Sequence, residues 1–304
     1  MSGKPRILIV GAYGQVGREL QRSFSDAGEI TLRDRDTVDL AQADEVRAMV
    51  RDAAPNVILN AAAYTAVDRA EAEPEMAMAV NEQAPRILAE EALRTDALLV
   101  HYSTDYVFDG SKTSPWVETD KPNPLNVYGT SKLAGEEAIR KAGGKYLIFR
   151  TSWVYGPHGS NYLLTMLRLG RERESLKIVD DQIGAPTTSV ELADATRAIV
   201  SGVLAGQFGD LSNWAGLYHM TSSGAVSWCG FAQAIFARAG DLLDGKMPVV
   251  HPILSSEYPV AAKRPQNSVI SNEKLRARFG VQLSSWEAAL DAVLLRLKAD
   301  RPGL

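Results

Sequence analysis

The fold is decided by the stretch Arg6-Ile-Leu-Ile-Val-Gly-Ala-Tyr-Gly-Gln-Val-Gly17, in which a short apolar run passes directly into a glycine-rich turn. We expect a buried strand over residues 6–10 and a helix over residues 15–27. Small residues in such a turn let the backbone approach a pyrophosphate, and the amides and dipole at the helix start favour the anion. This context predicts a dinucleotide site rather than an empty turn.

The rest of the first half alternates short β-branched runs with longer helical patterns. This alternation is typical of an α/β fold with a doubly wound parallel sheet of the Rossmann type. The expected strands cover residues 6–10, 30–33, 57–60, 98–102 and 145–150, and the expected helices cover residues 15–27, 43–53, 75–94 and 127–142.

The pattern becomes irregular after Trp153. We expect a dinucleotide-binding core over residues 1–152 and a mainly substrate-binding, smaller part over residues 153–304, from which later segments return to the core. The expected elements of this part are helices over residues 161–171, 190–204, 228–239 and 286–298, a strand over 176–179, a turn over 185–188 and a loop over 249–271.

The composition narrows the class of protein. The chain has 304 residues, of which 45% are hydrophobic and 23% charged, with a net charge of −4. Acidic and basic residues are intermixed, so we expect neither a nucleic-acid partner nor a membrane partner. The single cysteine, Cys229, and four histidines without metal-ligand spacing predict no disulfide and no metal site. A reducing, cytoplasmic location fits this composition best.

A candidate catalytic pair lies in the fourth expected helix. Tyr128 and Lys132 are four residues apart and therefore project from one face. A nearby ammonium favours the phenolate, so we expect it to lower the pKa of the tyrosine toward the working range. Thr104 and Asp105 follow the fourth expected strand, at the sheet edge where α/β folds present ligand-facing residues. The Thr104 hydroxyl there can hydrogen-bond a reacting carbonyl oxygen.

Several motifs resemble those of the dTDP-4-dehydrorhamnose reductase family, which belongs to the extended short-chain dehydrogenases and reductases. The motifs are GxxGxxG over residues 11–17, Asn60-Ala-Ala-Ala-Tyr-Thr-Ala-Val-Asp68, residues 101–110, Asn123-Pro-Leu-Asn-Val-Tyr-Gly-Thr-Ser-Lys132, Arg150-Thr-Ser-Trp-Val-Tyr-Gly156 and Arg264-Pro-Gln-Asn-Ser268. The resemblance implies reduction of the C4 keto group of dTDP-4-dehydro-L-rhamnose by NADPH or NADH. It implies Thr104, Tyr128 and Lys132 as the catalytic set.

The glycine turn and the resemblance together give a set of binding residues. The cofactor-binding residues are Gly11, Ala12, Tyr13, Gly14, Gln15, Val16, Gly17, Asp39, Leu40, Ala63, Tyr64, Thr65, Tyr128 and Lys132. The substrate-binding residues are Thr104, Asp105, Trp153 and Arg264. Arg264 is the candidate for the diphosphate, because a guanidinium suits bidentate phosphate binding.

Some choices stay open. Residues 33–36 read Arg-Asp-Arg-Asp, which offers both an acid for a ribose 2′-hydroxyl and an arginine for a 2′-phosphate, so NADH and NADPH are not distinguished. Tyr106 stands where related dehydratases carry a glutamate, which argues against elimination. A nucleotide-sugar epimerase of the same fold, or a non-catalytic nucleotide-binding subunit, remains an alternative.

Magnesium and a homodimer are also left open. The resemblance implies a magnesium site in some family members, built from acidic side chains at a dimer interface. This chain has Gln15 where those members carry an acid in the glycine turn, and Glu191 alone is not a site. The departure puts Mg²⁺, and the homodimer that uses it, in doubt.

Overall fold

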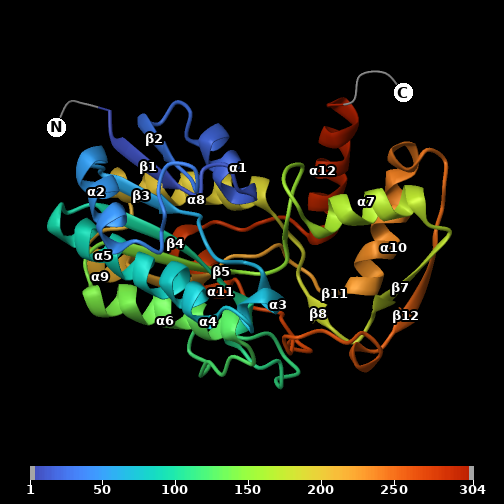
Figure 1. The fold of residues 1–304 in the computed structure, drawn as a ribbon. Coiled ribbons are helices and arrows are strands. Elements are labelled where there is room, and N and C mark those ends of the chain that lie inside the picture. Colours follow the sequence, from blue (N-terminus) through green and yellow to red (C-terminus); the bar gives the residue numbers. More distant parts are fainter. Residues whose placement is uncertain (1–3, 301–304) are drawn as a thin grey trace.

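A six-stranded parallel sheet forms the centre of the molecule, in the order β10-β5-β4-β3-β1-β2. The computed structural model describes residues 4–300 (Figure 1). The strands are β1 (Arg6–Val10), β2 (Glu29–Arg33), β3 (Val57–Asn60), β4 (Leu98–Thr104), β5 (Tyr146–Thr151) and β10 (Gly216–His219). The chain passes from β1 to β2 and then returns to β3 on the other side of β1. The switch point between β1 and β3 is where this kind of sheet binds a dinucleotide.

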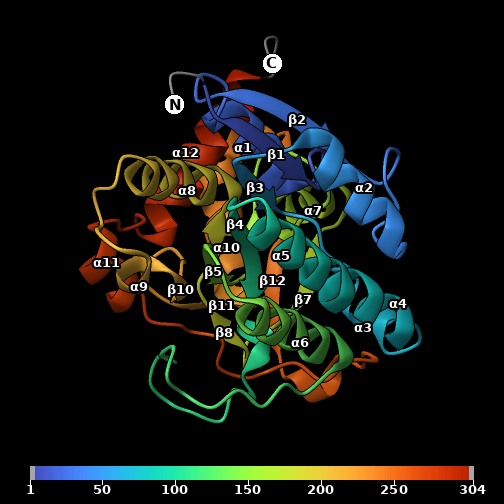
Figure 2. The same ribbon diagram turned by 90° about the vertical axis from the view of Figure 1, so that its left-hand side faces the viewer.

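Helices cover both faces of the sheet (Figure 2). One face packs against α1 (Gln15–Ser23) and α8 (Ser189–Leu204), and the other against α2 (Ala43–Ala53), α5 (Ala84–Arg94) and α6 (Val127–Ala142). Strands β3 and β4 are buried along their whole length, as expected for strands covered on both faces. The sequence prediction of a doubly wound parallel sheet is therefore confirmed.

A second, smaller core lies beside the sheet (Figure 1). Helices α7 (Tyr162–Glu172), α10 (Trp228–Ala239) and α12 (Trp286–Ala299) pack there around Tyr155 and Phe231. A two-stranded parallel sheet of β7 (Ser175–Val179) and β12 (Val249–Ile253) lies against α10. Several segments from this half of the chain belong instead to the large sheet and its covering helices, α8 and β10 among them.

The remaining elements are short. They are α3 (Val67–Ala70), α4 (Pro74–Met78), η1 (Ala79–Gln83), η2 (Asp105–Val107), β6 (Val154–Tyr155), β8 (Ile183–Gly184), β9 (Thr187–Thr188), α9 (Leu211–Trp214), β11 (Val226–Ser227), η3 (Gly240–Leu243), η4 (Ser255–Glu257) and α11 (Glu273–Phe279).

Three local expectations were wrong. The expected loop over residues 249–271 begins with β12, which pairs with β7, a strand so distant in the sequence that no local pattern reveals the partnership. The expected single helix over residues 75–94 contains a π-helical turn, η1, which brings the Asn81 carbonyl against α6. The helix expected over residues 15–27 ends at Ser23. Within residues 4–300, no helix combines the length and apolarity needed to cross a membrane.

Candidate active site

The glycine turn connects β1 to α1 at the switch point of the sheet. A Cβ at Gly17 would overlap the Gly11 carbonyl oxygen, and a Cβ at Gly11 would lie 2.7 Å from the Ala62 amide nitrogen. These contacts require glycine for close packing of turn, helix and neighbouring loop. Gly14 is the N-cap and has no side chain to occupy the amides of the first helical turn. The start of α1 is therefore available to an anion, as a dinucleotide pyrophosphate requires.

An acid at the end of β2 contacts this turn directly. The Tyr13 amide donates to Asp34 Oδ2 at 2.9 Å. Asp39, which the family resemblance places among the cofactor contacts, is exposed and accepts from the Ala41 amide within its own loop. Leu40 packs against the core on the α2 side of the sheet. Asp34 is thus a site residue to which the sequence assigned no definite role.

The loop after β3 carries the expected contacts Ala63, Tyr64 and Thr65 and lies beside the glycine turn, through the approach of Ala62 to Gly11. Asn81 holds this loop: its Oδ1 accepts from the Tyr64 amide at 2.8 Å, and its Nδ2 donates to the Tyr64 carbonyl at 3.1 Å. Asn81 Nδ2 also contacts Ser131 Oγ at 3.0 Å, which ties the loop to α6. The π-helical turn supplies this buried asparagine.

Thr104 and Tyr128 meet at the carboxyl end of β4. Their hydroxyls lie close to one another, and Thr104 Oγ1 donates to Asp105 Oδ1 at 2.9 Å. Asn126 caps α6 by accepting from the Gly129 amide at 2.8 Å, which fixes the helix start and with it Tyr128. Burial raises the pKa of Tyr128 to about 12. The tyrosine is therefore protonated at neutral pH and available as an acid.

Lys132 lies behind this pair and has other partners. Its Nζ donates to the Tyr102 carbonyl at 2.6 Å and lies 3.1 Å from His101 Nε2. Burial lowers the pKa of Lys132 to about 8, against the opposing charge of Glu136. The expected lowering of the Tyr128 pKa by the ammonium is not found, because burial of the phenol dominates and the amine is held by β4.

Asp105 is a buried carboxyl group at the start of η2. It accepts from Thr104 Oγ1 at 2.9 Å and from Ser152 Oγ at 3.2 Å. Desolvation nevertheless raises the pKa of Asp105 to about 6. With this pKa the Asp105 carboxyl group changes between its protonated and its ionised form just below neutral pH.

The Trp153 side chain is partly buried and does not line the large cavity. Its ring stacks on Trp228 with centroids 3.5 Å apart and an interplanar angle of 7°, and its backbone has a φ of 48°. A Cβ at Gly184 would overlap the same ring. Trp228, whose role the sequence did not reveal, lines the adjacent cavity. Trp153 therefore supports Trp228 from behind.

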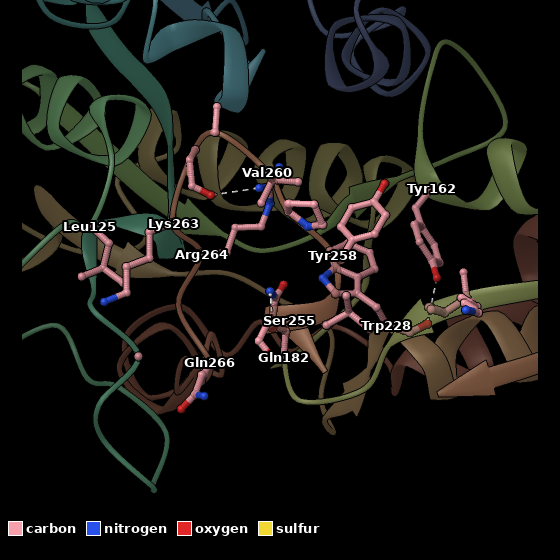
Figure 3. Close-up of a pocket in the computed structure, with 18 of the residues that line it drawn as sticks. Leu125, Tyr162, Gln182, Trp228, Ser255, Tyr258, Val260, Lys263, Arg264 and Gln266 are labelled. Atoms are coloured by element: carbon pink, nitrogen blue, oxygen red, sulfur yellow. Dashed lines mark hydrogen bonds between the residues drawn. The ribbon is translucent and has the colours of Figure 1, made fainter. Parts of the chain in front are cut away.

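A cavity of about 1180 Å³ opens between the second core and residues 255–266 (Figure 3), and neither Thr104 nor Tyr128 lines it. Lys263 and Arg264 bring two cations to its wall. Arg264 forms a bidentate pair with Asp68, with Nη2–Oδ2 at 2.6 Å, and its guanidinium lies near the Tyr106 hydroxyl. The Tyr106 ring meets the Tyr128 ring edge-on, with the ring centroids 5.8 Å apart. Tyr106 therefore lies between Arg264 of the cavity wall and the catalytic tyrosine.

The residues do not fit the magnesium site of the family resemblance. Glu191 accepts from the hydroxyl and amide of Ser284, and it shares a small cavity with Arg296. Arg296 Nη1 donates to Glu19 Oε1 at 2.9 Å, so a guanidinium already brings positive charge to this place. Across residues 4–300, no group of three or more acidic, histidine or cysteine side chains could hold a metal ion.

Hydride transfer to a carbonyl needs a dinucleotide and a proton donor near one another. The glycine turn after β1 can bind the dinucleotide, and Tyr128 of α6 is a proton donor beside Thr104 at the end of β4. This arrangement places the protein among the extended short-chain dehydrogenases and reductases. The family model of the RmlD substrate binding domain matches residues 5–299. The chain belongs to this family, the dTDP-4-dehydrorhamnose reductases.

Individual relatives agree along nearly the whole chain. The dTDP-4-dehydrorhamnose reductase of Burkholderia thailandensis is 48% identical over 94% of this chain and 96% of its own, and that of Escherichia coli K12 is 40% identical over 96% and 97%. The solved structure of the Bacillus anthracis enzyme in complex with NADP superposes with a TM-score of 0.87, at 36% identity over 96% of this chain and 99% of that one. A UDP-glucose 4-epimerase of Thermus thermophilus, at 20% identity over 97% of this chain and 100% of that one, shares the fold with a TM-score of 0.78.

Proposed function

We propose that this protein reduces the C4 keto group of dTDP-4-dehydro-L-rhamnose to give dTDP-L-rhamnose, with NADPH or NADH as the hydride source. Membership of the reductase family along residues 5–299 supports the proposal, as does the NADP bound in a similar solved structure. The observation that carries it is the closeness of the Thr104 and Tyr128 hydroxyls at the end of β4, two strands away from the glycine turn.

In this proposal two side chains of the protein bind and protonate the oxygen at C4. Thr104 and Tyr128 bind the keto oxygen between their hydroxyls, and Tyr128 gives its proton to the alkoxide as it forms. The raised pKa of Tyr128 keeps that proton in place until the oxygen becomes basic. A bound reduced nicotinamide supplies the hydride. Lys132 holds the ribose of that cofactor from below the site.

The remaining contacts follow from the positions of the elements. The backbone of residues 11–17 binds the pyrophosphate at the start of α1, and residues 63–65 border the same crevice. Arg264 and Lys263 bind the substrate diphosphate at the cavity wall, and Trp228, backed by Trp153, bounds the same cavity.

The wider assignments belong to the same proposal. Residues 1–152 form the cofactor part and residues 153–304 mainly the substrate part, with α8 and β10 returning to the sheet. A cytoplasmic location suits an enzyme of nucleotide-sugar metabolism. A homodimer, if formed, would not rest on the magnesium site, because Arg296 and Gln15 do not suit a metal.

Loss of absorbance at 340 nm tests the activity. The protein and NADPH, or NADH, receive the 4-keto sugar made enzymatically from dTDP-glucose by a dehydratase and an epimerase. We expect rapid oxidation of the cofactor and a fall of at least about 100-fold in kcat for Tyr128→Phe, which removes only the donated proton. Cofactor binding without oxidation of either nucleotide would refute the proposal and favour the non-catalytic alternative.

A further inference from the structure

Three buried side chains from three elements form a chain beneath the active site. Asn60 at the end of β3, His101 in β4 and Lys132 in α6 are each at most 2% exposed. Asn60 Nδ2 lies 3.0 Å from His101 Nδ1, and His101 Nε2 lies 3.1 Å from Lys132 Nζ. None of these contacts is needed for packing alone, since apolar side chains would fill the same space without polar groups to satisfy.

The donors and acceptors in the Asn60–His101 and His101–Lys132 contacts follow from where the protons of these side chains must lie. Asn60 Oδ1 accepts from the Ala62 amide at 3.2 Å, so the Asn60 amide nitrogen is the atom that faces the ring of His101. That nitrogen can only donate, and Nδ1 must accept. A neutral imidazole then carries its single proton on Nε2, directed at Lys132 Nζ. The Nε2–H group can donate a hydrogen bond to the lone pair of a neutral Lys132 amine. It cannot do so to an ammonium, which has no lone pair, so this arrangement favours the neutral amine.

We propose that His101, oriented by Asn60, is a positioning residue that favours the neutral amine of Lys132 and thereby sets the upper pH limit of the reaction. The inference rests on the reductase function proposed above, in which Lys132 holds the cofactor ribose, and it assigns that role to the ammonium form of the side chain. The Tyr102 carbonyl accepts from Nζ in either protonation state, at 2.6 Å.

Four other titratable groups lie near Lys132, namely those of Glu136, Tyr128, Asp105 and His101 itself. Glu136, one turn further along α6, favours the ammonium, but its carboxylate is engaged by Arg150 of β5 at 2.6 Å and by Ser103. Tyr128, one turn earlier, is neutral because burial raises its pKa. Asp105 has its own hydroxyl partners. Burial and the nearby lysine hold the pKa of His101 well below its usual value, which keeps the ring neutral as the proton count requires.

Nitrogen-15 NMR of the imidazole rings in the intact free protein tests the proton count without any turnover. The chain has four histidines, and His101→Gln identifies the resonances of His101. We expect an unprotonated Nδ1 and a protonated Nε2 at neutral pH. A proton on Nδ1, or on both nitrogens, would overturn the proposal even if the protein proves to be an active reductase.

Asn60→Asp tests the effect on the reaction. This isosteric change keeps an acceptor for the Ala62 amide, accepts a proton from Nδ1 and so turns Nε2 into an acceptor for the Lys132 ammonium. We expect the basic limb of the kcat/KM profile to move to higher pH by about one unit, because activity falls as Lys132 loses its proton.

A double variant separates the effect of reversing the His101 proton from the effect of the negative charge that Asn60→Asp introduces. In Asn60→Asp with His101→Gln, the imidazole that reverses its proton is absent, so we expect less than half of the shift. An equal shift in the single and double variants would show a purely Coulombic effect, and an unmoved limb in the single variant would show that His101 does not govern Lys132. A lack of any activity in the wild-type protein would instead count against the reductase function, and leaves the NMR result to judge the proton count.

Discussion

Asp105→Asn is expected to change how the stability of the protein depends on pH. Asp105 is 3% exposed, and desolvation raises its pKa to about 6 from the ordinary value of 3.8. The folded protein therefore binds this proton more tightly than the unfolded chain does. The resulting stabilisation is present in full below pH 3.8 and is lost as the pH rises through about 6.

The magnitude follows from those two pKa values. Between about pH 7.5 and about pH 5, linkage predicts that the free energy of unfolding of the wild type rises by about 1.4 kcal/mol relative to the asparagine variant. Hydrogen bonds that the variant gains or loses to Thr104 and Ser152 shift both measurements alike and cancel in this difference.

Urea denaturation of both proteins at the two pH values measures this quantity by linear extrapolation. Asp120→Asn is a matched control, because its partners lower the pKa of that carboxyl group from 3.8, so its difference from the wild type is expected to be nearly the same at both pH values. A difference between wild type and Asp105→Asn that is the same at both pH values would refute the assignment of a raised pKa to Asp105.

Three further changes test the packing and the binding residues. Glu136→Gln leaves the Arg150 guanidinium buried without its counter-charge, so we expect a loss of about 3 kcal/mol in urea denaturation, against little change for a surface Glu→Gln variant. Gly17→Ala places a methyl group against the Gly11 carbonyl, and we expect loss of NADPH affinity in fluorescence titration; unaltered affinity would show that the turn tolerates a Cβ. Arg264→Lys keeps the charge but loses bidentate geometry, so we expect KM for the nucleotide sugar to rise by about tenfold with a smaller change in kcat, whereas an unchanged KM would remove Arg264 from the substrate site.

Much of the large sheet could be predicted because its information is local. The strand over residues 6–10 and the helices over residues 43–53 and 127–142 have the predicted bounds, since buried parallel strands are short apolar runs and covering helices have clear periodicity. Tyr128 and Lys132 share a face of α6 for the same reason. The glycine turn could be placed because it follows its strand without a gap.

What escaped prediction depends on contacts distant in sequence. Strand β12 contains His251 and Pro252 and is largely exposed, so only its pairing with β7 makes it a strand. The partners of Lys132 lie far back in the sequence on β4, and no spacing rule reveals that the amine turns toward His101 rather than toward Tyr128. His101 and Asn60 both belong to motifs on which the family resemblance rests. Their side chains come into contact because the parallel pairing of β3 and β4 places the two residues side by side.

The most direct test of the account is transfer of deuterium from stereospecifically labelled [4-²H]NADPH to the sugar, with the product analysed by mass spectrometry and NMR. The two 4-position labels are tried separately, because only one face of the nicotinamide meets the substrate. We expect a single deuterium, at C4 of dTDP-L-rhamnose, from one of the two labels, and none with Tyr128→Phe over the same interval. A 6-deoxy sugar product without deuterium at C4 from either label would contradict hydride transfer to the keto group and with it the assignment of this site as a reductase.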